Sequence, residues 1–260
     1  MNDLEGMNPQ SRFTDRADDY AKYRPTYPAA ALDWLLYNLG DPGKLRVADV
    51  GAGTGISSRL LAERGCQVVA VDPNPDMLAH ARRHTRVRYV AAHAENTGLP
   101  SGSFNLVTCF QSFHWFERDS ALQEFVRILK PLGRVAVLWN TRVKTDPFMH
   151  AYDRLIAAFG DDIKRIHDAR QIASPAEALG IYGLVRVERV EFAHFHRMDF
   201  AGLLGYARSC SYLPCEGTPY VRLREGLAVL HERFADPGGY VVFPYRTTAY
   251  RGDRAPRAAS

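Results

Sequence analysis

The segment best suited to chemistry is a glycine-rich turn, Val47–Gly55, which reads Val-Ala-Asp-Val-Gly-Ala-Gly-Thr-Gly. Glycines let the backbone turn sharply and let a ligand approach the main chain, and a following helix offers free N–H groups to an anionic group. Asp49 precedes Gly51 by two residues, and Asp72 ends the next apolar run. An acid at that second position can accept both ribose hydroxyls of an adenosine. The alternative is a tight strand-to-helix turn that binds nothing.

The spacing of the glycines and the charge of Asp49 separate two classes of ligand. A dinucleotide fingerprint, G-x-G-x-x-G, would place its third glycine at Ile56, whereas this chain reads G-x-G-x-G. A carboxylate at Asp49 would repel a pyrophosphate. It would favour a ligand that carries an ammonium and a sulfonium and that places its own carboxylate against the N–H groups of the turn. S-adenosylmethionine has that distribution of charge, so the pattern favours it over a nicotinamide dinucleotide.

Alternating strands and helices are expected to position this turn. Short runs rich in Val, Ile and Ala alternate with helix-period segments between about Leu45 and Asn140, which is typical of βαβ units. We expect strands at Arg46–Gly51, Gln67–Asp72, Val87–Ala91, Phe104–Phe110 and Arg134–Trp139, and helices at Ile56–Arg64, Pro75–His84 and Ser120–Leu129, the last with Asp119 as N-cap. The pattern predicts an α/β fold: a doubly wound, Rossmann-like, mostly parallel seven-stranded sheet with helices on both faces.

The second half of the chain has a less regular pattern. Helices are expected at Asp146–Ile166, Ser174–Leu179, Asp199–Arg208 and Pro219–Phe234, and strands at Gly183–His194 and Gly239–Tyr250. Pro244 predicts an edge position or a bulge in the last strand. We interpret residues 13–250 as one domain, with lid helices at 13–44, a cofactor-binding core at 45–140, and last strands with helical insertions at 141–250. Flexible segments, 1–12 and 251–260, would flank it.

Composition and charge exclude several classes of protein. With 46% apolar residues in 260, the chain can bury a sizeable core. The 33 basic and 29 acidic residues leave a net charge of +4, which does not require a nucleic-acid partner. Cys66, Cys109, Cys210 and Cys215 form no CxxC pair, so we expect reduced thiols and no zinc site. With no apolar run long enough for a bilayer and no signal peptide, a cytoplasmic protein without membrane partners is expected.

Longer motifs carry a resemblance to a known family. VADVGAGTG and VVAVDPNPDML resemble the first two motifs of class I S-adenosylmethionine-dependent methyltransferases. HAENTGLPSGSFNLVTCFQSFHWF and ALQEFVRILKPLGRVAVLW look like later motifs of the type 11 methyltransferase family. FTDRADDYAKYRPTYP, SYLP and YVVFPYRTTAYRG are similar to a trans-aconitate methyltransferase-like subgroup. One departure is Leu132, where the family usually has a glycine.

The resemblance implies roles for particular residues. The methionine end of S-adenosylmethionine would lie near Asp49, the glycine turn and the end of the fourth strand, and its ribose would contact Asp72. The implied cofactor-binding residues are Arg24, Asp49, Gly51, Ala52, Gly53, Gly55, Asp72, Pro73, Met77, Ala94, Glu95, Phe110 and Gln111.

Several residues are candidates for the acceptor side of the reaction. His114 would act as a general base or orient the acceptor, or it is a hydrogen-bonded histidine in a packed loop. Tyr20 would belong to a lid over the sulfonium, or to a helix packed on the sheet edge. The candidate pocket residues are Trp115, Arg208, Tyr212 and Tyr245, and an arginine such as Arg208 or Arg246 would suit an anionic substrate.

These observations predict an enzyme that transfers a methyl group from S-adenosylmethionine to a small molecule by in-line displacement, with a carboxylate among the acceptors considered. S-adenosylhomocysteine would be the product, and no metal is needed. Three alternatives stay open: a non-catalytic S-adenosylmethionine-binding protein, an RNA or protein methyltransferase, and a nicotinamide-dependent oxidoreductase. The residues do not distinguish O-, N- or C-methylation, or a monomer from a homodimer.

Overall fold

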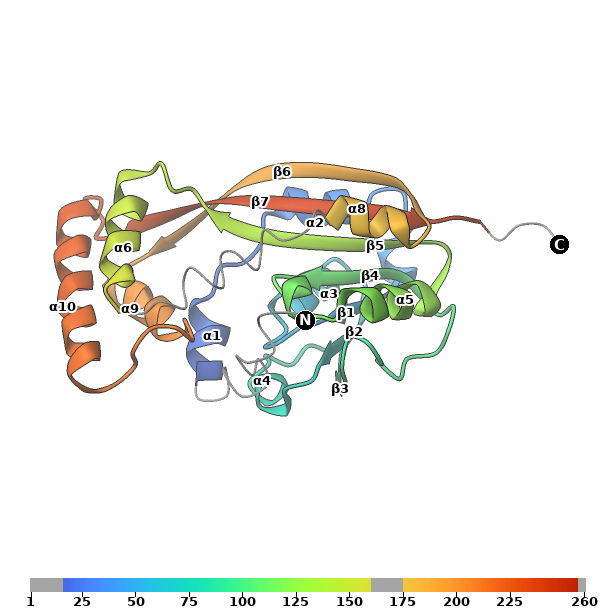
Figure 1. Ribbon diagram of the computed structural model, residues 1–260, viewed down its shortest axis with the longest axis horizontal. Coiled ribbons are helices and arrows are strands. Elements are labelled where there is room, and N and C mark those ends of the chain that lie inside the picture. The colour runs from blue at the N-terminus through green and yellow to red at the C-terminus, as the bar shows by residue number, and fades with distance from the viewer. Residues whose placement is uncertain (1–15, 160–174, 257–260) are drawn as a thin grey trace.

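The computed structural model describes residues 16–159 and 175–256, and in them a seven-stranded sheet has the order β3-β2-β1-β4-β5-β7-β6 (Figure 1). The neighbouring strands β1 to β5 pair in parallel, and β7 pairs antiparallel with both β5 and β6. This confirms the predicted mostly parallel, doubly wound sheet. The strands are β1 Arg46–Val50, β2 Gln67–Asp72, β3 Val87–Ala91, β4 Phe104–Phe110, β5 Leu129–Arg142, β6 Leu184–Met198 and β7 Val241–Arg254.

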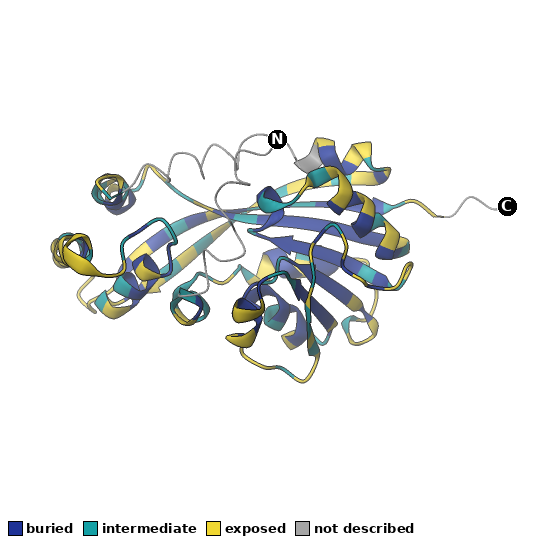
Figure 2. Cartoon of the chain, turned by 60° about the horizontal axis from the view of Figure 1, so that its bottom comes forward, coloured by how far each residue is buried: buried dark blue, intermediate teal, exposed yellow. Residues whose placement is uncertain are grey.

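Helices cover both faces of the sheet, because the central strands are apolar on both sides. One face packs against α5 (Arg118–Ile128) and α8 (Pro175–Ile181). The other face packs against α2 (Ala29–Leu36) and α3 (Ile56–Glu63). Figure 2 shows the consequence: the central strands of the sheet are largely buried, whereas the edge strands β3 and β6 and the outer surfaces of the helices carry exposed residues.

Two predicted helix boundaries are wrong. The N-cap of α5 is Glu117, not Asp119, because the longer Glu117 side chain accepts hydrogen bonds from the backbone N–H groups of Asp119 and Ser120. Helix α4 (Pro75–Ala79) ends well before His84. Its buried residues are Met77 and Leu78, and the arginines that follow are exposed, so no apolar face continues to hold the helix.

The last strand is longer than predicted, so residues 251–254 do not belong to a flexible tail. Arg251 and Asp253 are buried in β7. Asp253 Oδ1 accepts a hydrogen bond from Arg134 Nε at 2.7 Å, and Arg251 pairs with Glu188. The predicted edge position or bulge at Pro244 is not what the sheet shows, because β7 lies between β5 and β6 and Pro244 pairs with Phe195; the proline is tolerated since the β5–β7 pairing ends one residue away, at Arg142↔Tyr245.

The insertions form a helical layer beyond the carboxyl end of β5. Helices α6 (Pro147–Ala157), α9 (Phe200–Arg208) and α10 (Gly217–Phe234) share an apolar cluster with the projecting parts of β6 and β7. Helix α1 (Ala17–Tyr23) packs against α9, and a short 3-10 helix, η3 (Pro42–Lys44), precedes β1 (Figure 1). The predicted flexible segment 1–12, the first residues of the lid and the end of the predicted helix Asp146–Ile166 lie outside the described residues.

Candidate cofactor and acceptor site

The glycine turn connects β1 to α3 at the carboxyl edge of the parallel strands. Gly51, Gly53 and Gly55 all have positive φ, and Gly55 is the N-cap of α3. The N–H groups of Gly51 and Ala52 both donate to the carbonyl oxygen of Val71, at 2.8 and 3.0 Å. A Cβ at Gly51 would lie 2.4 Å from Ser112 Oγ. The tight fit against Ser112 explains why this position is a glycine.

Asp49 is fully buried below the turn. Its Oδ2 accepts hydrogen bonds from Ser57 and Ser58 at 2.6 and 2.5 Å, and its Oδ1 accepts one from Thr108 at 2.8 Å. Burial raises the pKa of this carboxyl, and the three hydroxyl bonds oppose that rise. The carboxyl group is therefore held in one orientation at the end of β1.

The Asp72 carboxylate connects the glycine turn to the start of α4. Its Oδ2 accepts a hydrogen bond from the N–H of Gly53 at 2.8 Å, and its Oδ1 accepts one from Asn74 at 2.9 Å. Burial raises the pKa of the Asp72 carboxyl, and both N–H groups oppose it. Each oxygen of a carboxylate has a second lone pair, so both can also accept a ribose hydroxyl.

The residues implied for the adenine lie after β2 and β3. Met77 is buried, and its Cε lies 3.2 Å from the position that a Cβ on Gly53 would take. Pro73 is partly buried and Ala94 is buried. Glu95 Oε1 accepts a hydrogen bond from the N–H of Glu117, which ties the loop after β3 to the start of α5.

The end of β4 brings the next group of predicted residues to the same edge of the sheet. Phe110 packs edge-on against Tyr27, with ring centroids 4.7 Å apart. Gln111 has a positive φ of 59°, an uncommon conformation for this residue type, and such residues concentrate at functional sites. Its Nε2 donates to the carbonyl oxygen of Asn140 at 3.0 Å, while its buried Oε1 has no hydrogen-bond partner among the described residues. His114 is buried beside the partly exposed Trp115.

Arg24 lies between two tyrosines at the end of α1. Its guanidinium carbon is 4.8 Å from the ring centroid of Tyr20 and 5.5 Å from that of Tyr206, and one of its NH2 groups donates to the carbonyl oxygen of Ser209. Burial alone would lower the pKa of Arg24. The neighbouring groups Cys210 and Tyr20, with the other tyrosines around them, raise it by more, so the pKa lies above its ordinary value. Arg24 is therefore a partly buried side chain that stays cationic.

The predicted acceptor residues divide into two groups. Tyr245 is buried, and its hydroxyl donates to the hydroxyl of Tyr206 at 3.1 Å. Burial raises the pKa of Tyr212 and that of Tyr245, and the charges of Arg142 and Arg24 oppose the rise at both. In contrast, Arg208 is about half exposed and pairs with Asp19, and Arg246 is exposed and pairs with Glu191. These two arginines are already neutralised at the surface.

The structure adds polar residues that the sequence reasoning missed. The register of the last three strands aligns Arg142 of β5, Tyr245 of β7 and His194 of β6 in one row across the sheet. Arg142 contacts Tyr152 of α6, with its guanidinium carbon 5.4 Å from the ring centroid, and pairs with Asp153 at 2.8 Å. Because side chains alternate along a strand, the sequence of β5 puts Arg142 on the same face as Asn140. Only the register of the three strands shows that Tyr245 and His194 are its neighbours.

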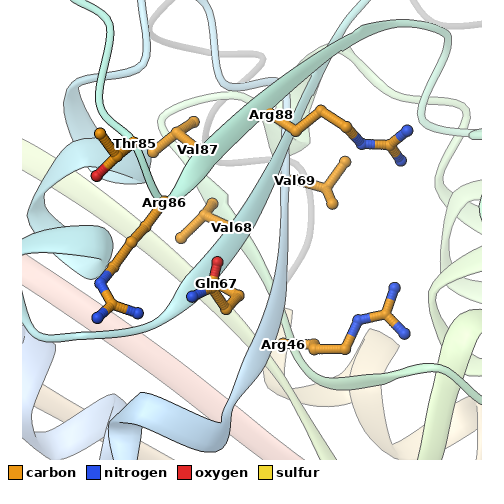
Figure 3. Close-up of a pocket in the computed structure, with 8 residues that line it drawn as sticks. All are labelled: Arg46, Gln67, Val68, Val69, Thr85, Arg86, Val87 and Arg88. Atoms are coloured by element: carbon orange, nitrogen blue, oxygen red, sulfur yellow. The ribbon is translucent and has the colours of Figure 1, made fainter.

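A hollow lies at the amino edge of the sheet, opposite the glycine turn (Figure 3). It is lined by Arg46, Gln67, Val68, Val69, Thr85, Arg86, Val87 and Arg88. The arginine side chains are exposed and do not converge: Arg86 points away from Arg46 and Arg88. These charges are therefore not gathered around one point in the hollow.

Two kinds of site are absent from the described ranges, 16–159 and 175–256. There, no three His, Cys, Asp or Glu side chains gather as ligands for a metal ion. No helix in the same ranges combines the length and the apolar character that crossing a bilayer requires.

Comparison with known proteins gives the family. A family model described as a methyltransferase domain matches residues 48–137. An uncharacterized methyltransferase of Mycobacterium tuberculosis is 32% identical over 251 residues, which cover 94% of this chain and 96% of that protein. An uncharacterized methyltransferase of Schizosaccharomyces pombe is 33% identical over 249 residues, with the same coverage of both chains. The chain belongs to the class I S-adenosylmethionine-dependent methyltransferases.

Solved structures agree with this assignment. A structure described as a putative type II methyltransferase from Anaeromyxobacter dehalogenans superposes with a TM-score of 0.66 at 26% identity, covering 90% of this chain and all of that one. A phosphoethanolamine N-methyltransferase of Haemonchus contortus, solved with S-adenosylhomocysteine, has a TM-score of 0.57 at 17% identity and shares the fold; the match covers 98% of this chain and 60% of that one. Among the proteins compared by sequence rather than by structure, a ubiquinone/menaquinone biosynthesis C-methyltransferase of Vibrio vulnificus is 29% identical over 211 residues. The match covers 74% of this chain and 72% of that protein.

Proposed function

We propose that this methyltransferase binds S-adenosylmethionine at the glycine turn and transfers its methyl group to a small-molecule acceptor. The observation that carries the proposal is the pair of acids at one turn: Asp49 lies buried beneath it, and Asp72 holds the N–H of Gly53 from the next strand. Gly51 leaves no room for a side chain there, and the buried Gln111 Oε1 offers a free acceptor beside the turn. These groups fit a nucleoside with a positively charged amino-acid tail.

Different residues around the turn would contact different parts of the cofactor. Asp72 would hold the ribose hydroxyls, Met77 and Ala94 would contact the adenine, and Asp49 and Gln111 would lie near the methionine end. When bound, the cofactor would supply a methyl carbon activated by its sulfonium: the acceptor would form a bond to that carbon as the carbon–sulfur bond breaks, and the thioether S-adenosylhomocysteine would be the leaving group. The aromatic side chains Tyr20 and Tyr27 would keep water from the reacting atoms, because the dispersed positive charge of the transfer is favoured in a dry aromatic site.

We propose a carboxylate as the acceptor. Arg24 is a partly buried cation whose Nε is fully buried, and it has no carboxylate partner among the described residues; the charge of Arg142 acts on the same tyrosines. A buried cation requires compensation by an anion, which a bound acid would provide. A carboxylate is already deprotonated, so alignment with the methyl group can supply most of the acceleration without a general base.

Methylation at carbon is the second candidate, because one similar protein is described as a C-methyltransferase. A carbon nucleophile requires removal of a proton, and His114 at the end of β4 is the residue we assign to that role in this case. The fate of the label distinguishes the two candidates: a methyl ester releases methanol in mild alkali, and a C-methyl product does not.

The test combines binding with product analysis. We expect S-adenosylhomocysteine to raise the unfolding temperature, whereas NAD does not. Methyl-labelled S-adenosylmethionine is then incubated with a panel of small carboxylic acids, and alkali-labile label in the products supports ester formation. If NAD raised the unfolding temperature and S-adenosylhomocysteine did not, the proposal that the glycine turn binds S-adenosylmethionine would be contradicted. Tight binding of S-adenosylhomocysteine with no transfer to any member of a broad panel would favour a non-catalytic binding protein.

A further inference from the structure

Polar side-chain atoms without partners gather around one residue of the helical layer, Tyr206 of α9. The ring centroids of Tyr152 and His196 lie 6.4 and 6.3 Å from that of Tyr206, and the guanidinium carbon of Arg24 lies 5.5 Å from it. Among the described residues, none provides a hydrogen-bond partner for the buried Tyr152 hydroxyl, Arg24 Nε or His196 Nδ1. Buried polar atoms are nearly always satisfied, so a cluster of exceptions indicates a ligand or water.

Tyr152 is the clearest of these exceptions. Helix α6 begins at Pro147 with Asp146 as its N-cap, and its buried stripe carries Phe148, Met149, Tyr152 and Ile156 towards the sheet. The Tyr152 side chain is fully buried. Its ring packs against that of Phe243 with centroids 4.9 Å apart. Phenylalanine would make the same apolar contacts without burying an unsatisfied hydroxyl, so packing alone does not explain a tyrosine here.

The neighbouring hydroxyls do not have this problem. Tyr245 donates to Tyr206, so each of these two phenols has a partner within the protein. Of the three phenols Tyr152, Tyr206 and Tyr245, the Tyr152 hydroxyl is therefore the one that is left for an external partner.

The charges around Tyr152 indicate what that partner carries. Burial raises the pKa of the Tyr152 phenol, so it keeps its proton and can donate it in a hydrogen bond. Arg142 lies against the ring, and the nearby Arg24 Nε can only donate. Donors and positive charge together suit oxygen atoms of an anionic or carbonyl group.

We propose that Tyr152 is a specificity-determining residue of the acceptor site, and that its hydroxyl donates a hydrogen bond to an oxygen atom of the methyl acceptor. This inference rests on the proposed function, because it assigns the region between α1, α6 and α9 to the acceptor. It gives α6 a part in choosing the acceptor.

The test uses Tyr152→Phe in the full-length protein saturated with S-adenosylhomocysteine, with benzoate as the probe and benzyl alcohol as its neutral counterpart. We expect the wild type to bind benzoate in preference to benzyl alcohol. A lost hydrogen bond to a charged oxygen should weaken benzoate binding by about 10-fold or more in Tyr152→Phe. Binding of S-adenosylhomocysteine should be unchanged.

A stability measurement separates this role from a structural one. Without benzoate, Tyr152→Phe should unfold at the same temperature as the wild type or at a higher one, because no protein partner is lost. The matched control, Tyr245→Phe, should unfold at a lower temperature, because it breaks the bond to Tyr206.

Three results would overturn the inference: failure of the wild type to prefer benzoate, equal benzoate affinity in Tyr152→Phe, or a lower unfolding temperature of Tyr152→Phe. If S-adenosylhomocysteine itself does not bind, the proposed function fails first, and the two failures are thereby distinguished.

Discussion

Adding one methyl group to the glycine turn, at Gly51, should lower the free energy of unfolding by several kcal/mol, about 2 to 5. In Gly51→Ala the new Cβ would lie 2.4 Å from Ser112 Oγ and 2.5 Å from Ser112 Cβ, at a residue with φ of +70°. The left-handed conformation costs a residue with a Cβ about 1 to 2 kcal/mol. Overpacking adds about 1 to 3 kcal/mol, so we expect a total destabilisation of about 2 to 5 kcal/mol.

The control is Gly98→Ala. Gly98 has φ of +65°, and a Cβ there would meet nothing within 4 Å. Both variants share the backbone strain and the loss of unfolded-state entropy, so the difference between them isolates the contact with Ser112. Urea denaturation should show Gly51→Ala less stable than Gly98→Ala by about 1 to 3 kcal/mol. Equal stability of the two variants would refute the argument from close contact.

Further predictions concern Asp253, Leu132 and Asp49. Asp253→Ala should lower the free energy of unfolding by about 3 to 5 kcal/mol in urea denaturation, because it leaves the buried Arg134 without its carboxylate; a loss below 1 kcal/mol would contradict this. Leu132→Gly should raise the free energy of unfolding by about 0.5 to 1 kcal/mol. The exposed Leu132 has a φ of 63°, and glycine relieves that backbone strain at a smaller entropic cost. Because burial raises the native pKa of Asp49, its ionised form opposes folding above that pKa, and the cost disappears as the pH falls through it. Asp49→Asn removes this titration, so its unfolding temperature relative to that of the wild type should be highest at neutral pH and should fall in acid; a difference that does not change with pH would contradict the assignment.

The cofactor half of the molecule could be predicted from sequence because its information is local. A strand, a glycine turn and a helix follow one another between Val47 and Glu63, and the spacing to Asp72 fixes the neighbouring strand. The predicted strands β1 to β4 and the helix α3 agree with the structure within about a residue at each boundary. Apolar runs covered on both faces leave few alternatives for such a segment.

The acceptor half could not be predicted in the same way, because its contacts are not local. Arg208 was a reasonable choice for an anionic substrate by residue type, but α1 places Asp19 beside it. The row Arg142–Tyr245–His194 depends on the register of three strands that are separated by helical insertions. The boundary at residue 250 was also placed too early, because the partner of Asp253 is Arg134, more than a hundred residues away in the chain.

The most direct measurement is a calorimetric titration of the protein with S-adenosylhomocysteine, repeated with Asp72→Ala. We expect a saturable heat of binding to one site in the wild type. Loss of two hydrogen bonds from ribose hydroxyls to a charged group should weaken binding by about 100-fold or more in Asp72→Ala. A wild-type protein that gives no heat, or an Asp72→Ala variant that binds as tightly as the wild type, would contradict the assignment of the cofactor site.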